Sequence, residues 1–274
     1  MIDCMKTVLS IAGTDSIGGA GSQADIKTFS ALGVYGMSVI TSVYASNTCN
    51  VFGYQDISPY MVEKQIDAVF SDILPDAVKI GLLPCSDVVM VVAKKLRELK
   101  PANVVLDPVI IPKWGGELVD KATVNALVDI LIPLSTIITP NLLEAERLSN
   151  RVINELIDMR EAASFIYNLG CRAVVIKGVK QGCYKKEAVD ILYDGTNFLE
   201  LSAPMISHRN MGTGCTLSSA IAANLALGYS YQQSFKHAKN YVLEAMSHAP
   251  KLGKGEFGPI SHSYELEQIR LNNI

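Results

Sequence analysis

The sequence predicts one α/β domain with a central, mostly parallel sheet that is covered by helices on both faces. Short apolar runs alternate with amphipathic helical stretches along nearly all of the chain, as they do in repeated strand–helix–strand units. The predicted strands are almost continuously apolar, which is typical of strands buried on both faces. Because no linker, composition shift or internal repeat divides the 274 residues, we expect residues 1–274 to form a single domain.

The chain opens with two strand–helix units. Residues 7–13 (TVLSIAG) form a short apolar run and predict the first strand. Residues 22–33 place apolar side chains at helical spacing and end in Gly33, a common helix stop. Residues 38–45 are rich in β-branched side chains and predict a buried strand, and residues 61–73 predict an amphipathic helix.

The middle of the chain repeats this alternation. Residues 77–83 predict a strand, and residues 86–100 predict a helix that begins with a Ser-x-Asp cap. That helix ends in basic side chains, which the helix dipole favours. Residues 103–110 predict the next strand, and residues 122–134 are mostly helical, with Pro133 near their end.

The last part of the chain completes the sheet and closes with two helices. Residues 187–204 contain two strand-like runs around Asp194-Gly195 and predict a hairpin. The other predicted elements are a strand at 136–141, helices at 142–149 and 155–170, a strand at 173–178, and helices at 216–228 and 231–249.

The composition excludes several classes of function. Lys and Arg number 24 and Asp and Glu number 27, so the net charge is −3 and no nucleic-acid-binding surface is expected. No basic block suggests binding to a membrane surface, and no run reaches the ~18 apolar residues of a transmembrane helix. The N-terminal apolar run ends in Gly-Thr-Asp and is interpreted as a strand, not as a signal peptide, so we expect a cytoplasmic protein.

The cysteines are scattered and include no CxxC pair. Without a secretory signal, this spacing predicts reduced thiols and neither a disulfide framework nor a zinc site. The six cysteines are Cys4, Cys49, Cys85, Cys171, Cys183 and Cys215.

Ligands of a parallel sheet bind outside the carboxyl ends of its strands, so the residues there are candidates for a site. After the first strand, Gly18, Gly19 and Gly21 allow a ligand to approach the backbone closely and lead into a helix. The segment matches neither a P-loop nor a dinucleotide-binding motif. A tight turn alone explains the glycines, but Asp15 beside them favours a ligand site.

Polar side chains also follow four other predicted strands. Ser46 either hydrogen-bonds a heterocycle or closes a turn. Asp107 either caps a turn or holds Mg²⁺, which is usually bound by one or two carboxylates together with phosphate and water. Asn141 and Glu144 either cap a helix or join that magnesium site. Lys177 either extends to solvent or neutralises a phosphate.

The segment Gly212-Thr213-Gly214-Cys215 leads into a helix. The N–H groups and the positive dipole end at a helix start bind anions, and glycines let these groups point at one cluster of oxygens. The same field lowers the pKa of a cysteine, so Cys215 is predicted to be a partly ionised thiol beside a phosphate site. The alternative is a small buried cysteine that packs on the sheet.

Several segments together resemble the ribokinase-like small-molecule kinases, in particular the hydroxymethylpyrimidine/phosphomethylpyrimidine kinases of thiamine biosynthesis. SIAGTDSIGGAGSQADIKTFSALGVYG resembles the opening of that family, and LDPV and ITPNLLEAE resemble its metal and nucleotide motifs. VVIKG resembles its phosphate-side strand, GTGCT its catalytic segment, and GKGEFGP (253–259) its C-terminal signature. The similarity covers nearly the whole chain, and the combination of motifs is highly specific.

The resemblance implies a ribokinase-like three-layer αβα sandwich that uses ATP and Mg²⁺. The implied reaction phosphorylates a hydroxymethyl group on a pyrimidine and then the resulting monophosphate, and the family also suggests a homodimer. Cys215 would be the base, Glu144 and Asp107 would hold the metal, and Asp107, Asn141, Lys177 and Thr213 would contact ATP. The implied catalytic segment is Gly212, Thr213, Gly214 and Cys215, and the implied substrate positions are Gly13, Asp15, Ala20, Asp25, Ser46 and Val109.

Two positions depart from the family pattern and leave an alternative open. Ser46 stands where the family usually has glutamine, whose amide offers both a donor and an acceptor to an aminopyrimidine. Met211 stands where histidine is common. Because Ser46-Asn47 also resembles pyridoxal kinases, a pyridoxine/pyridoxal kinase of vitamin B6 salvage is the alternative, although Pro112 argues against one pyridoxal-active variant that has a cysteine nearby. A non-catalytic binding module would have lost a metal or base residue, and none is lost here.

Overall fold

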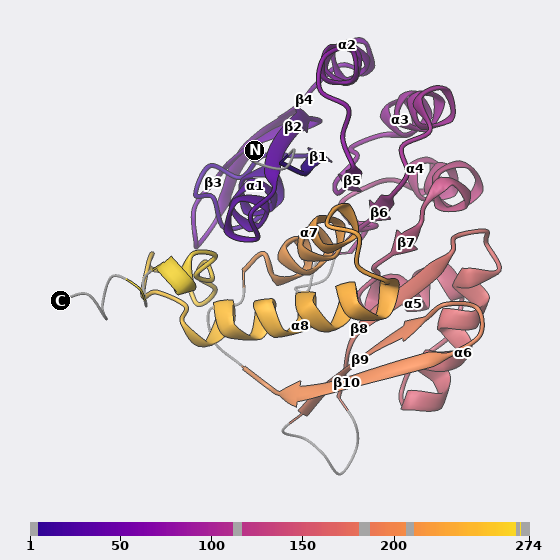
Figure 1. Ribbon diagram of the computed structural model, residues 1–274, viewed down its shortest axis with the longest axis vertical. Coiled ribbons are helices and arrows are strands. Elements are labelled where there is room, and N and C mark those ends of the chain that lie inside the picture. The colour runs from indigo at the N-terminus through magenta and orange to yellow at the C-terminus, as the bar shows by residue number, and fades with distance from the viewer. Residues whose placement is uncertain (1–4, 112–116, 181–186, 207–210, 267–268, 270–274) are drawn as a thin grey trace.

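The computed structural model describes residues 5–111, 117–180, 187–206, 211–266 and 269. Its central sheet has eight strands in the order β10-β9-β8-β7-β6-β5-β1-β2 (Figure 1). The six strands β8, β7, β6, β5, β1 and β2 run parallel to one another, while β9 is antiparallel to both β8 and β10. The strands are β1 (Thr7–Ala12), β2 (Tyr35–Ile40), β5 (Ala77–Ile80), β6 (Val104–Leu106), β7 (Ile137–Ile138), β8 (Ala173–Lys180), β9 (Glu187–Tyr193) and β10 (Phe198–Pro204).

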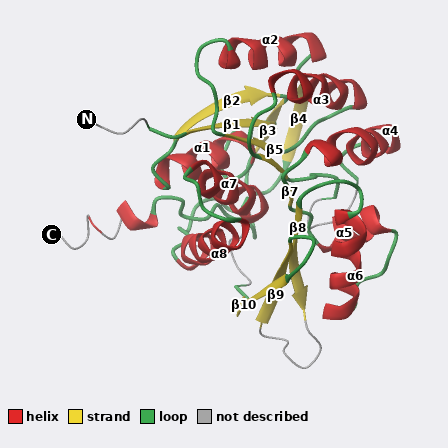
Figure 2. Ribbon diagram, turned by 45° about the vertical axis from the view of Figure 1, so that its right-hand side comes forward, coloured by secondary structure: helices red, strands yellow, loops and turns green. Residues whose placement is uncertain are grey.

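Helices cover both faces of the sheet, which confirms the predicted three-layer sandwich (Figures 1 and 2). One helix layer contains α1 (Gly21–Ala31), α7 (Thr213–Ala226) and α8 (Tyr231–Ser247). The other contains α2 (Pro59–Phe70), α3 (Ser86–Leu99), α4 (Lys121–Ala126), α5 (Leu142–Ser149) and α6 (Leu156–Tyr167). In the part of the chain that the structure describes, no helix is both long and apolar enough to cross a membrane.

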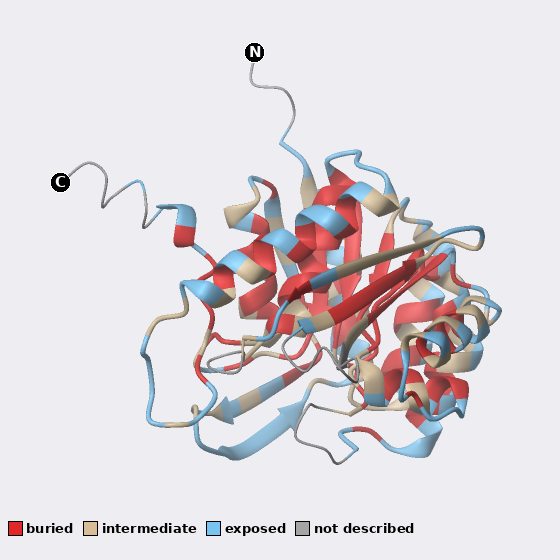
Figure 3. Ribbon diagram, turned by 90° about the horizontal axis from the view of Figure 1, so that it is seen from below, coloured by how far each residue is buried: buried red, intermediate tan, exposed pale blue. Residues whose placement is uncertain are grey.

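The central strands lie buried between these layers, whereas the edge strands β2 and β10 are partly exposed and the outer faces of the helices are exposed (Figure 3). Successive side chains of a strand point to opposite faces, so each strand contributes to two separate cores. In β5, Val78 and Ile80 pack on the α2–α6 side, while Ala77 packs on the α1–α7 side. The alternation therefore directs Lys79 toward the α1–α7 layer, where a buried cation requires an acidic partner.

The predicted single strand at 38–45 is wrong. The chain forms β2 and then β3 (Ser42–Ser46), which belong to different sheets. They separate at Thr41, whose N–H donates to the Ala12 carbonyl at 3.1 Å and whose carbonyl accepts from the N–H of Ile57 at 2.9 Å. β3 then pairs antiparallel with β4 (Val51–Asp56), which the sequence did not predict because every residue of β4 is exposed.

The other predicted helices and strands agree with the structure to within a few residues at each end. The hairpin predicted at 187–204 is confirmed as β9 and β10. The helix predicted at 122–134 begins as α4 but continues as a π-helical segment, Leu127–Leu131, and a 3₁₀ turn, Ile132–Leu134. Pro133 lacks an N–H and therefore cannot continue the α-helical hydrogen bonds.

The thiols within the described ranges are free, as the spacing of the cysteines predicted. These residues are Cys49, Cys85, Cys171 and Cys215. Cys4, Cys183 and Pro112 lie outside the described residues.

Candidate active site

The carboxyl end of β6 and the second half of β8 bring an ion pair to the edge of the sheet. Asp107 directly follows β6, and Lys177 of β8 donates from Nζ to Asp107 Oδ1 at 2.8 Å. Thr139, which follows β7, donates to the same carboxylate oxygen at 3.1 Å. Only 14% of the Lys177 side chain and 5% of the Asp107 side chain are exposed. The predicted meeting of these two strand ends is therefore present in the structure.

Both members of this pair remain charged. Burial opposes the charge of Asp107, but Lys177 and Lys79 outweigh it and lower the pKa of the carboxyl. Burial also opposes the charge of Lys177, while Asp107 and Glu144 raise the pKa of its ammonium. The edge of the sheet thus presents a buried cation beside carboxylates, which is a suitable environment for a metal-bound polyphosphate.

The N-terminus of α7 lies directly against the Asp107–Lys177 pair. A methyl group built on Gly214 would lie 3.3 Å from Lys177 Nζ and 3.7 Å from Asp107 Oδ2. Gly212, just before the helix, has a φ of 77°, in the region that glycine adopts readily. A Cβ there would collide with the carbonyl oxygen of Gly19, so the glycine loop and the start of α7 pack together.

This helix start has the properties of an anion site. The N–H groups of a first helical turn have no acceptor within the helix, and Gly212 provides no side-chain cap. The positive end of the helix dipole adds to their attraction for negative charge. Gly214 of this first turn lies beside Lys177, the lysine that is predicted to contact phosphate.

Asp15 and Ser46 shape the glycine loop. The Asp15 carboxylate is buried and accepts from the N–H groups of Gly19 and Ala20 through Oδ2, each at 2.9 Å. Its Oδ1 accepts from Ser46 Oγ at 2.6 Å. In the structure these two side chains bind each other and the loop, so a direct contact of either with substrate stays a prediction.

The side chain of Asp25 is used within the protein, so its predicted place near the pyrimidine stays a prediction. The side chain of Asp25 is fully buried, and its two oxygens accept from Lys79 Nζ at 2.8 and 2.9 Å. Ser10 Oγ donates to one oxygen at 2.6 Å, and Ser219 Oγ donates to the other at 2.7 Å. Burial opposes the charge of Lys79, but Asp25 raises the pKa of the ammonium. Asp25 therefore ties α1 to β1, β5 and α7 beneath the site.

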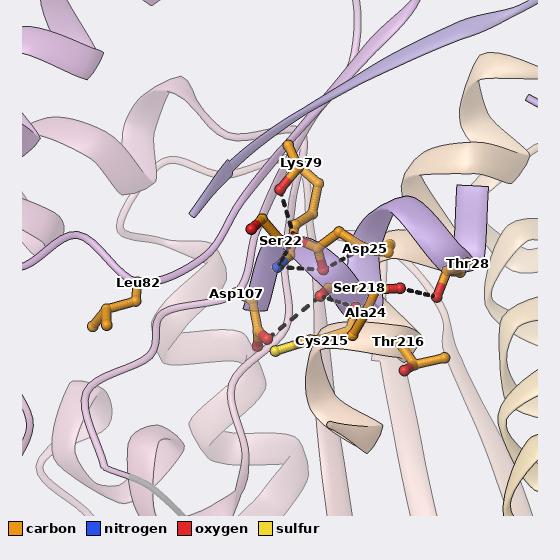
Figure 4. Close-up of polar contacts among 12 residues, drawn as sticks. Ser22, Ala24, Asp25, Thr28, Lys79, Leu82, Asp107, Cys215, Thr216 and Ser218 are labelled. Carbon is orange, nitrogen blue, oxygen red and sulfur yellow. Dashed lines mark hydrogen bonds and ion pairs between the residues drawn. The ribbon is translucent and has the colours of Figure 1, made fainter. Parts of the chain in front are cut away.

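Cys215 is half-buried in the first turn of α7, and Figure 4 shows its sulfur turned toward the Asp107 carboxylate. Burial raises the pKa of the thiol, and the carboxylates of Asp25 and Asp107 raise it further. Lys79 and the N–H of Gly21 act in the opposite direction but do not outweigh these effects. The predicted partly ionised thiol is therefore wrong for the free protein, because the sequence revealed neither the burial of the sulfur, which is the largest effect, nor the two carboxylates near it.

Asn141 and Glu144 form a capping box at the start of α5, so the capping interpretation is confirmed. Asn141 Oδ1 accepts from the Glu144 N–H at 3.0 Å, and Glu144 Oε2 accepts from the Asn141 N–H at 2.8 Å. Glu144 Oε1 also accepts from the N–H of Ile110 at 3.2 Å. Burial, with Asp107 nearby, raises the pKa of Glu144 to about 7, although Lys177 and the backbone N–H groups oppose the shift.

The donor chemistry of this corner fits a hard divalent cation. Asp107 and Glu144 are both buried, and the electrostatic effect of Asp107 on Glu144 shows that one carboxylate disfavours the charge of the other. A cation between carboxylates relieves such repulsion. Within the described ranges there is no cluster of three His, Cys, Asp or Glu that could bind a metal unaided. Phosphate and water would therefore complete the coordination, as they commonly do for Mg²⁺.

The remaining predicted substrate positions lie around the same loops. Gly13 directly follows β1, and a methyl group there would contact Leu82 at 3.5 Å. Ala20 lies against Gly212, and the N–H of Val109 donates to the Asp107 carbonyl at 2.9 Å. Their contact with a pyrimidine stays a prediction.

Sequence reasoning missed two contributors to the site. Lys79 was recognisable as one lysine within an otherwise apolar strand, AVKIG, a position that requires a buried partner. Thr48, in the β3–β4 turn, had no recognisable signal. Its Oγ1 accepts from the N–H groups of Lys254 and Gly255 at 3.1 and 3.0 Å, so the C-terminal motif 253–259 is joined to the turn.

Comparison with known protein families gives one match that covers most of the chain. The sequence pattern described as phosphomethylpyrimidine kinase matches residues 15–261. The hydroxymethylpyrimidine/phosphomethylpyrimidine kinase of Bacillus subtilis is 43% identical over 255 residues, 93% of this chain and 93% of that protein. A bifunctional thiamine biosynthesis protein of Geobacter sulfurreducens is 43% identical over 265 residues, 96% of this chain; the match spans 54% of that longer protein.

Two solved structures share the fold. The phosphomethylpyrimidine kinase of Clostridium difficile has a TM-score of 0.79 and 43% identity, and the likeness covers 88% of this chain and 99% of that one. An ADP complex of Bacillus subtilis pyridoxal kinase has a TM-score of 0.87 and 38% identity, covering 95% of this chain and 98% of that one. Of these two structures, the one with the higher identity is named for phosphomethylpyrimidine and the one with the higher TM-score is named for pyridoxal.

Proposed function

This chain belongs to the phosphomethylpyrimidine kinase family and is a small-molecule kinase, and we propose that it acts in thiamine diphosphate biosynthesis. It transfers the γ-phosphoryl group of ATP to the hydroxymethyl group of 4-amino-5-hydroxymethyl-2-methylpyrimidine. It then phosphorylates the resulting monophosphate. This reaction is supported by the names of relatives that match this chain over almost their full length.

One observation carries the proposal: the start of α7 lies against the Asp107–Lys177 pair. This arrangement brings the N–H groups of a helix start, a buried lysine and a thiol to one edge of the sheet. Phosphoryl transfer depends mainly on positioning and on stabilising the charge of the phosphoryl oxygens. The N–H groups from Thr213 to Cys215 and the ammonium of Lys177 are suited to both tasks.

Magnesium fits the acidic corner next to this pair. Glu144 and Asp107 would hold Mg²⁺ together with the nucleotide phosphates, and Asn141 would orient Glu144 through the capping box. When bound, Mg²⁺ neutralises charge on the phosphates. Lys177 supplies a second positive charge from the protein itself.

Cys215 accepts the hydroxyl proton of the substrate in this proposal. The thiol of the free protein is protonated at neutral pH because its pKa is raised. Lys79 and the Gly21 N–H favour the thiolate and partly offset the two neighbouring carboxylates. Neutralisation of Asp107 by a bound cation would remove one of the effects that raise the pKa of Cys215.

Pyridoxine or pyridoxal is the second candidate substrate, because Ser46 replaces the usual glutamine and a pyridoxal kinase shares the fold at a TM-score of 0.87. Ser46 Oγ donates its hydrogen to Asp15, so its hydroxyl can offer the aminopyrimidine an acceptor but no donor in this arrangement. Purified protein with MgATP is to be assayed with hydroxymethylpyrimidine and pyridoxine side by side. A higher kcat/KM for the pyrimidine supports the main proposal, and a higher value for pyridoxine replaces it.

The oligomeric state and the location are also proposed. The protein works as a homodimer in the cytoplasm and needs no nucleic acid or membrane partner. Light scattering at several protein concentrations tests the dimer, and a constant monomeric mass would contradict it.

A further inference from the structure

A β-bulge interrupts β8 at the lysine of the site. Two residues of β8, Lys177 and Gly178, stand opposite a single residue of β9, Asp190, because the pairing shifts between Ile176 and Val179. Two residues against one is the pattern of a bulge, which bends its strand and often re-aims a side chain next to an active site. Gly178 has a φ of 86°, a conformation that glycine adopts without strain.

Asp190 holds this bulge with its side chain. Its Oδ1 accepts from the N–H of Gly178 at 2.6 Å, where a regular ladder would offer a backbone carbonyl. Its Oδ2 accepts from Lys239 Nζ of α8 at 2.6 Å. Only 8% of the Asp190 side chain and 11% of the Lys239 side chain are exposed. The ion pair therefore connects the bulge to α8 inside the protein.

The bulge also determines where Lys177 lies. The N–H of Lys177 donates to the Pro140 carbonyl at 3.1 Å, next to the end of β7. Its Nζ lies 2.8 Å from Asp107 Oδ1 and close to the backbone of Gly214. Because the strand bends at residues 177 and 178, a change in the bulge would move this ammonium along the edge of the sheet.

We propose that Asp190 and Lys239 are positioning residues for the kinase: together they hold the bulge that places Lys177 beside Asp107 and against the start of α7. The inference rests on the proposed function, in which Lys177 contacts the nucleotide phosphates. A buried ion pair is seldom required for stability alone, because apolar pairs of similar volume often stabilise a fold equally well. Here the pair is directed at the N–H of the residue that follows Lys177.

Two variants test the proposal by different routes. The double variant Asp190→Ala/Lys239→Met removes the pair without leaving a buried charge alone. Gly178→Ala keeps the pair but disfavours the positive φ, and a methyl group there would meet nothing within 4 Å. If the double variant does not fold, Gly178→Ala still tests the bulge.

The same chain offers a matched control for each variant. Asp194→Ala/Gln232→Met removes another link from the β9–β10 hairpin to α8, in which Gln232 Nε2 donates to Asp194 Oδ2 at 2.6 Å. Gly228→Ala introduces alanine at a φ of 91°, also with open space around the methyl group, at the far end of α7. Neither control touches the bulge.

Two readings are taken for every variant: kinetics with both substrates, and the affinity for MgADP from calorimetry. We expect both test variants to lose about tenfold in kcat/KM for MgATP and in MgADP affinity, the scale of one weakened charged contact. The KM of the test variants for the alcohol substrate should stay within about twofold of the wild-type value, because binding of that substrate does not use Lys177. Both control variants should match the wild type within about twofold. Folded test variants that match their controls in both readings would overturn the inference.

The two proposals fail in different ways. Wild-type protein that phosphorylates no pyrimidine contradicts the proposed function, while MgADP affinity still reports on the bulge without any turnover. Active wild-type protein whose test variants bind MgADP normally contradicts the positioning role alone. Wild-type protein that does not bind MgADP contradicts both.

Discussion

Replacing Lys79 with methionine should destabilise the protein strongly. The substitution leaves the Asp25 carboxylate in a fully buried position without its cation. The carboxylate keeps two hydroxyl donors, Ser10 and Ser219, but neither carries a positive charge. Removing one partner of a buried pair costs about 3–5 kcal/mol of unfolding free energy.

The magnitude follows from the surroundings of the pair. Both side chains have zero exposure, and four hydrogen bonds of 2.6 to 2.9 Å converge on the two carboxylate oxygens. In a domain of this size, a loss of 1 kcal/mol lowers Tm by roughly 2–4 °C, so Lys79→Met should lower it by about 10 °C. Reversible urea unfolding, followed by circular dichroism, measures the free energy directly.

A double variant supplies the control. Lys79→Met/Asp25→Asn removes both charges and keeps an amide oxygen as acceptor for one serine. It should recover most of the lost stability, because neither charge is then buried alone. A loss of less than about 1 kcal/mol of unfolding free energy in Lys79→Met would show that the buried pair does not behave in this way. The same holds if the double variant loses more unfolding free energy than the two single variants lose in total.

Three further predictions concern catalysis. Cys215→Ala should lower kcat by about 10²-fold or more, the usual scale for a general base, in a steady-state assay with MgATP; ordinary turnover would remove Cys215 from the mechanism. Because the pKa of Cys215 is raised above its usual value and the thiolate is the active form, kcat/KM of the wild type should rise with pH from neutrality toward that pKa, and a flat profile would contradict a thiolate base. Because Glu144 has a pKa of about 7 and must lose its proton to bind metal, the Mg²⁺ requirement should increase as the pH falls below 7. Glu144→Gln should raise the Mg²⁺ concentration for half activity and abolish this pH dependence, and an unchanged Mg²⁺ titration would exclude its metal role.

The sheet and the convergence of the site were predictable because both depend on local patterns. Apolar strands alternating with helices determine a parallel sheet, and the carboxyl ends of such strands lie at one edge. Asp107 and Lys177 therefore met as expected. The break at Thr41 was not predictable, because it depends on hydrogen bonds to Ala12 and Ile57 that are distant in sequence.

The electrostatic state of the site could not be predicted from spacing alone. The helix start favours a thiolate at Cys215, but burial and the carboxylates of Asp25 and Asp107 have the larger effect. Those carboxylates lie far from residue 215 in the sequence and approach it only in the folded chain. The same limit applies to Asp190, whose partners Gly178 and Lys239 lie on other elements.

A crystal structure of the protein with hydroxymethylpyrimidine and a non-hydrolysable MgATP analogue would show whether the thiol of Cys215 and the nucleotide phosphates meet at the start of α7. We expect the substrate hydroxyl to lie within hydrogen-bond reach of Cys215 Sγ, roughly 3.5 Å. We also expect the nucleotide phosphates to contact Lys177 and the γ-phosphate to contact the N–H groups at the start of α7. A hydroxyl group that points away from the sulfur would contradict the proposed role of Cys215. Phosphates bound elsewhere on the sheet would contradict the proposed phosphate site at the start of α7.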